Sequence, residues 1–126
     1  MGFDQYHEPP EELPAETRTF ARLCASLTEE AEAIGWYEQR LSIEPNPVAR
    51  AVMQNAVGEE YKHFSMDLEF LLRRTPLWRE IAQGILFQGG DIVEHGEEAE
   101  EGAVEDAAER GAPLVGSTSL GIGSLR

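Results

Sequence analysis

A stripe of side chains spaced alternately by three and four residues limits the possible folds of this chain more than any other feature. Its members are Phe20, Leu23, Leu27, Glu30, Ile34, Tyr37 and Leu41. A seven-residue repeat of this kind is typical of an α-helix that packs lengthwise against another helix. Glu30 is the one member that is neither apolar nor aromatic. Because burying an unpaired carboxylate is costly, its place in a packing stripe calls for a partner.

Residues 44–47, with the sequence EPNP, separate this helix from a second one. Pro45 and Pro47 cannot both lie inside a helix. Asn46 is a favourable N-cap and Pro47 a favourable first helical residue, so we expect the second helix to begin there. The short break predicts that the two helices fold back as an antiparallel hairpin. The second helix carries one stripe of Val57, Tyr61, Phe64, Leu68 and Leu71, and beside it another of Ala49, Met53, Ala56, Glu60, His63, Asp67 and Phe70.

Similar signals place the ends of the helices. Pro14 suits the first turn of the first helix, and Arg73 and Arg74 suit the last turn of the second. Pro76 blocks continuation, so Thr75 is expected to cap a short third helix over 76–87, closed by Gly89-Gly90. We therefore divide the chain into an extended arm (1–13), a helical hairpin domain (14–88), an acidic flexible linker (89–118) and a short apolar peptide (119–126).

Composition narrows the possible partners. The chain has 126 residues and a net charge of −14, which disfavours nucleic acids and anionic membranes as partners. Residues 91–110 hold nine Asp or Glu and one Arg, and we interpret them as part of a solvated linker. The single cysteine, Cys24, excludes an internal disulfide and fits a reducing cytoplasm. We expect no signal peptide or membrane span, and so small a domain favours oligomerisation.

Three polar side chains are predicted to converge on the hairpin. Glu60 and His63 are three residues apart, so they project from one face of a helix. Glu30 lies fifteen residues before residue 45 and Glu60 fifteen after it, which puts both about 22 Å from the turn. Glu60 would repel Glu30 unless a cation joined them, so the spacing predicts either a metal site or an ordinary polar patch. Tyr37 lies two turns from Glu30 on the same stripe.

The number of donors suggests how such a site is completed. One chain offers two carboxylates and one imidazole, too few to enclose a pair of iron ions. Two chains related by a twofold axis offer four carboxylates and two imidazoles, the ligand set of di-iron carboxylate bundles. The hypothesis is an active site that exists only at a dimer interface.

A second acidic patch is predicted on the first helix. Glu29, Glu32 and Trp36 lie within about 60° of one another and well away from Glu30. They form either a solvated face with one exposed tryptophan or a weak cation-attracting surface on the way to the site.

Several stretches together resemble the encapsulated ferritins, which are ferritin-like proteins carried inside encapsulin nanocompartments. They are YHEPP (6–10), EEAEAIGWYEQR (29–40), EEYKH (59–63), LF (86–87) and the extreme C-terminus. The resemblance implies an all-α subunit of two antiparallel helices and a shorter third. Such subunits form a ferritin-like four-helix arrangement only on dimerisation, and five dimers form a ring-shaped decamer. The ring oxidises Fe(II), and the surrounding shell stores the ferric product.

The resemblance also assigns roles to residues of this chain. It implies that Glu30, Glu60 and His63 are ferroxidase ligands supplied by both members of a dimer, with Tyr37 beside the iron pair. It places Glu29, Glu32 and Trp36 at an outer site that feeds iron inward. The tail SLGIGSLR (119–126) resembles a cargo-loading peptide for the encapsulin shell, with Leu120, Ile122 and Leu125 as apolar anchors.

The expected function is therefore a cytoplasmic ferroxidase inside an encapsulin compartment, with two iron ions per dimer-interface site. Its expected partners are the shell protein and further copies of the chain, without nucleic acid or membrane. Two alternatives remain open at this point. One is another di-iron oxidase or peroxidase on the same scaffold, and the other is a metal-free acidic helical interaction protein.

Overall fold

The computed structural model describes residues 5–111, and within this range the chain is all-helical. After a short 3-10 helix at Pro10–Glu12 come α1 (Ala15–Ile43), α2 (Pro47–Arg74), α3 (Pro76–Gln83) and α4 (Ile92–Arg110). The chain divides into two units, residues 1–71 and 72–126. The C-terminal peptide 119–126, with its proposed anchors Leu120, Ile122 and Leu125, lies outside the described residues.

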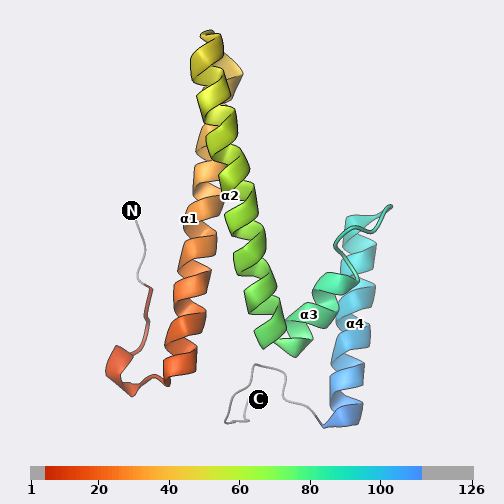
Figure 1. Cartoon of the computed structure of the whole chain (residues 1–126). Helices are drawn as coiled ribbons and strands as arrows, with labels where there is room; N and C mark the ends of the chain where they lie inside the picture. Colours follow the sequence, from red (N-terminus) through yellow and green to blue (C-terminus); the bar gives the residue numbers. More distant parts are fainter. Residues whose placement is uncertain (1–4, 112–126) are drawn as a thin grey trace. The chain divides into compact units, whose positions relative to one another are not determined.

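The first unit contains the predicted antiparallel hairpin, in which α1 and α2 lie side by side (Figure 1). Asn46 caps α2 as expected, because its Oδ1 accepts hydrogen bonds from the backbone N–H of Val48 at 2.9 Å and of Ala49 at 3.0 Å. The Arg50 guanidinium donates to the carbonyl oxygens of Leu41 and Glu44. These contacts satisfy backbone groups that helix ends leave unpaired, so they fix the turn.

The N-terminal arm is held to the start of α1. Arg18 donates to the carbonyl oxygens of Pro10, the first residue of the 3-10 helix, and of Leu13, its C-cap. The expected extended arm is therefore wrong for Pro10–Glu12, which are helical. Pro14 is the N-cap of α1, one position before the first turn in which it was expected.

The hairpin buries little by itself. Among the described residues of the first unit, only Val57 and Leu71 are buried. Several large apolar side chains on the two helices are exposed, namely Trp36, Ile43, Val48, Val52, Tyr61, Met66 and Phe70. A helix pair with so small a core is marginal as an isolated unit.

The second unit corrects the predicted linker, because Ile92–Arg110 form the helix α4 and pack against α3. Asp91 caps α4 through its side chain, which accepts from the N–H of Glu94 at 3.0 Å, and Gly111 ends it at a φ of 70°. Ala103 and Ala107 are buried, and Arg110 pairs with Glu80 on α3 at 3.4 Å. The acidic side chains do not prevent the helix because most of them project into solvent.

The third helix is shorter than expected. It ends at Gln83 rather than at residue 87, and a turn follows over residues 84–87. Gly84 lies so close to α4 that a Cβ built there would come within 2.6 Å of the Ala99 Cβ. Thr75 occupies the predicted N-cap position, but its side chain makes no capping hydrogen bond. None of the helices in residues 5–111 is both long and apolar enough to cross a membrane.

Candidate metal centre

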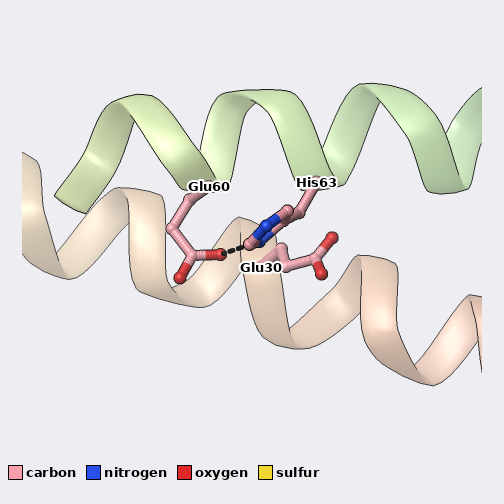
Figure 2. Close-up of side chains that lie close together, drawn as sticks. All are labelled: Glu30, Glu60 and His63. Carbon is pink, nitrogen blue, oxygen red and sulfur yellow. Dashed lines mark ion pairs between the residues drawn. The ribbon is translucent and has the colours of Figure 1, made fainter. Parts of the chain in front are cut away.

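The hairpin brings Glu30, Glu60 and His63 together, as the spacing predicted. One donor atom from each side chain lies within 4.8 Å of the donor atoms of the other two. Glu30 comes from α1, and Glu60 and His63 come from successive turns of α2 (Figure 2). In that view the imidazole of His63 lies between the two carboxylates. Within residues 5–111, these three side chains form the group of His, Cys, Asp or Glu residues that is placed to hold a metal ion.

Glu60 and His63 approach each other along α2 without forming a hydrogen bond. The Nδ1 atom of His63 lies 3.9 Å from Oε1 of Glu60, beyond hydrogen-bonding distance. On its other side, Nε2 of His63 lies 4.0 Å from Oε1 of Glu59. The ring is 46% exposed, so one side of this centre remains open in the single chain.

Glu59 and Lys62 belong to the solvated surface next to the centre. Lys62 Nζ lies 2.8 Å from Oε1 of Glu59, and more than half of each side chain is exposed. The hydrogen bond and positive charge of Lys62 lower the pKa of the Glu59 carboxyl. Glu59 is therefore already paired and ionised without a metal.

The pKa of the Glu30 carboxyl is shifted in the opposite direction. The pKa of its carboxyl is raised to about 7, first by burial, then by a hydrogen bond and charge from Asp67, and also by the charges of Glu60 and Glu29. A hydrogen bond between two carboxyl groups needs a proton on one of them. With both groups ionised, Oε1 of Glu30 and Oδ2 of Asp67 are buried atoms without a hydrogen-bond partner.

Asp67, which contacts Glu30, is the neighbour of this cluster that the sequence did not single out. It follows His63 by four residues and Glu60 by seven, so all three share one face of α2. The sequence contained a signal for Asp67, because it is the third polar member of the predicted stripe that also holds Glu60 and His63.

The other predicted site residues lie outside the cluster of three donors. Tyr37 is half-buried, with the Arg40 guanidinium 5.2 Å from the centre of its ring. Glu29, Glu32 and Trp36 are exposed on α1, and Trp36 lines a shallow surface pocket of about 280 Å³ with Gln39 and Arg40. Glu29 and Glu32 are not among the side chains that line it.

The donor set fits a divalent transition metal. Carboxylate oxygens are hard donors, and combined with imidazole nitrogen they suit iron. Atoms that bind one ion at about 2.1 Å lie about 3 to 4 Å apart, so small side-chain rotations would let one ion contact all three residues. Two buried carboxylate oxygens without partners are also what a cation would neutralise.

Comparison with known proteins gives a consistent result. The family model described as EncFtn-like matches residues 5–89. An encapsulated ferritin-like protein of Rhodospirillum rubrum is 41% identical over 122 residues, covering 95% of this chain and 86% of that protein. A ferritin-like protein of Thermotoga maritima is 38% identical over 108 residues, covering 86% of this chain and 95% of that protein.

A solved structure has the same fold. The crystal structure of protein ne0167 from Nitrosomonas europaea matches with a TM-score of 0.68 and 35% identity. The match covers 71% of this chain and 98% of that one.

Proposed function

This chain belongs to the EncFtn-like family, and on that premise we propose that it is a ferroxidase, oxidising Fe(II) at a di-iron site shared between two copies of the chain. The observation that carries the proposal is the convergence of Glu30, Glu60 and His63 on the hairpin. The names of the relatives from Rhodospirillum rubrum and Thermotoga maritima, which contain the word ferritin, support an iron-related role.

The shared site follows from the number of donors. Two carboxylates and one imidazole leave an iron ion with open coordination positions and cannot enclose two ions. A twofold axis beside His63 doubles the set to four carboxylates and two imidazoles. Each copy then supplies half of the ligands.

The exposed apolar surface of α2 supports the same arrangement. At about 100° per residue, Val52 and Phe70 lie within about 20° of His63, and Val48 and Met66 within about 60°. All four are exposed, with exposed fractions from 45% to 71%. A partner helix that covered this surface would also close the open side of the imidazole. Contiguous exposed apolar surface of this kind is typical of an interface.

The reaction is a transfer of one electron from each Fe(II) to an oxidant. With O₂, four Fe(II) and four protons give four Fe(III) and two molecules of water. Glu30 and Glu60 balance the charge of the ions, and His63 supplies a nitrogen ligand. Glu30 would give up its proton as the metal binds, because one oxygen cannot hold both. Tyr37, two turns away on α1, is a candidate for hydrogen bonding or electron donation near the site.

The proposal extends to the setting in which the iron is used. We infer that the ring oligomer works inside an encapsulin shell in the cytoplasm and that the shell receives the ferric product. The word encapsulated in the name of the Rhodospirillum rubrum relative supports this. The ring-shaped decamer, the outer site at Glu29, Glu32 and Trp36, and the anchoring role of the C-terminal peptide stay predictions.

An anaerobic titration with Fe(II), followed by addition of O₂, tests the function. We expect about one iron per chain and ferric absorbance after O₂ is added, with both lost in Glu30→Ala. Glu59→Gln, which removes a carboxylate already paired with Lys62, is the matched control and should retain both.

Three results would contradict the proposal. Oxidation at the wild-type rate in Glu30→Ala would refute the site. No binding of Fe(II) by the wild-type chain would favour a metal-free interaction protein. Faster oxidation with hydrogen peroxide than with O₂ would instead assign the same centre to a peroxidase-like enzyme.

A further inference from the structure

Asp67 has a buried oxygen without a hydrogen-bond partner next to the proposed centre. Its Oδ2 atom is buried. Oε1 of Glu30 is also buried and also lacks a hydrogen-bond partner. A buried carboxylate oxygen is normally paired with an N–H, a hydroxyl group or a cation. Within residues 5–111, neither oxygen has a hydrogen-bond partner.

The neighbour of Asp67 is itself an acid. The carboxyl groups of Asp67 and Glu30 are in contact across the hairpin, one from α2 and one from α1. When both groups are ionised they repel each other, so the contact is favourable only with a proton or a cation between them. A cation between them would satisfy both oxygens at once and remove the repulsion.

The position of Asp67 extends the donor row on α2. Glu60, His63 and Asp67 lie on successive turns of one helix face, at spacings of three and four residues. In Figure 2 the Glu30 carboxylate extends past His63, away from Glu60. An ion held by Glu30 at that end therefore lies towards the turn of α2 that carries Asp67.

We propose that Asp67 is a fourth ligand of the centre in each chain, supplying a carboxylate oxygen to the ion that Glu30 holds. The inference rests on the proposed metal centre and adds a residue to it. A third carboxylate makes the site richer in hard oxygen donors. Such a site favours ions such as Fe(II) and Mn(II) over softer ones.

Binding of Co(II) to the full chain tests this ligand without relying on iron oxidation. Co(II) absorbs visible light in a way that reports its ligands, and its affinity follows from the same titration. We expect Asp67→Asn and Asp67→Thr to weaken binding at least tenfold and to change the absorption spectrum. Asp67→Glu, which keeps a carboxylate, should recover most of the affinity.

Glu59→Gln is the matched control, because it removes the same charge from the same helix one turn from His63. We expect its affinity to stay within twofold of the wild type, with an unchanged spectrum. Metal-free Asp67→Asn should fold with wild-type helical content, since the substitution nearly preserves the shape of the side chain and its amide can still form a hydrogen bond with Glu30. Circular dichroism checks that point.

Three outcomes separate this inference from the proposed function. Wild-type affinity and spectrum in Asp67→Asn, with binding lost in Glu30→Ala, would overturn the inference and leave the centre intact. Equal weakening in Asp67→Asn and Glu59→Gln would also overturn it, since general electrostatics would then be the cause. Unchanged binding in Glu30→Ala would overturn the proposed centre itself.

Discussion

The carboxyl groups of Glu30 on α1 and Asp67 on α2 are in contact inside the hairpin, and each has a buried oxygen. In the metal-free chain this contact is favourable only while one of the two groups carries a proton. The pKa of Glu30 is accordingly raised to about 7, first by burial and then by Asp67. Proton binding, metal binding and stability are therefore linked at this contact.

The first prediction concerns the stability of the metal-free chain. The pKa of the Glu30 carboxyl is about 7 in the folded state and 4.5 in its ordinary state, so the folded chain keeps a proton that the unfolded chain releases. The contribution of Glu30 to stability is therefore greatest below pH 4.5 and falls as the pH rises towards 7. Urea unfolding between pH 4.5 and 8 measures this dependence.

Glu30→Gln supplies the comparison, because glutamine does not titrate. The wild type should lose stability relative to Glu30→Gln as the pH rises, so the unfolding free energy of the variant minus that of the wild type should increase. A difference that stays constant across this range would contradict the raised pKa. Saturating Co(II) should reduce the dependence, since the metal takes the place of the proton.

The second prediction concerns self-association through the apolar side of α2. Met66 is 60% exposed and lies within about 60° of His63 around the helix. Met66→Glu would place a charge in the proposed interface, so the dissociation constant should rise at least tenfold, with loss of iron binding. Sedimentation velocity at several concentrations measures the association.

Tyr61→Glu is the control for that experiment. Tyr61 is 53% exposed, but it lies about 160° from His63 on α2. This variant should keep the dimer and its iron. A dimer that survives Met66→Glu and dissociates in Tyr61→Glu would move the twofold axis to the other side of the helix.

The third prediction concerns the packing of α4 on α3. A Cβ added at Gly84 would meet the Ala99 Cβ at 2.6 Å, and neither atom can rotate away. Gly84→Ala should therefore cost about 1 to 3 kcal/mol by overpacking. Hydrogen exchange of the α4 amides should become faster.

Gly102→Ala is the matched substitution on α4 itself. A Cβ at Gly102 meets no atom within 4 Å, so alanine should stabilise the helix by about 1 kcal/mol. Slower hydrogen exchange of the α4 amides in both Gly84→Ala and Gly102→Ala would show that α4 does not pack closely on Gly84.

The fourth prediction concerns the C-terminal peptide. Deleting residues 119–126 should leave iron oxidation unchanged, because Glu30, Glu60 and His63 all lie on the hairpin. The same deletion should abolish packaging when the chain is produced together with an encapsulin shell. Shells that still contain the shortened chain after purification would refute the anchoring role.

The convergence of Glu30, Glu60 and His63 was largely predictable from the sequence because helix geometry is regular. Equal distances from the EPNP break placed Glu30 and Glu60 at one level, and the three-residue spacing placed His63 beside Glu60. Asp67 was not predicted as a member, although it has the right spacing from His63. Whether a stripe residue is buried depends on the neighbouring helix, which the spacing on α2 does not reveal.

The helix α4 was not predicted, although local signals for it exist. Asp91 stands at the N-cap, Gly111 at the C-terminal end, and Ala99, Ala103 and Ala107 recur every four residues. The high density of acidic side chains suggested a solvated linker instead. Local sequence alone does not show that Ala99 lies close to Gly84, the C-cap of α3.

The sequence by itself determined the helical hairpin, its turn and the level at which Glu30, Glu60 and His63 meet. These depend on periodicity, caps and chain length, which are local properties of the chain. Only the tertiary structure decided that Glu30 faces Asp67, that both have buried oxygens, and that the acidic segment folds against α3. Those features depend on how closely two helices approach, because burial and charge repulsion arise only between packed surfaces.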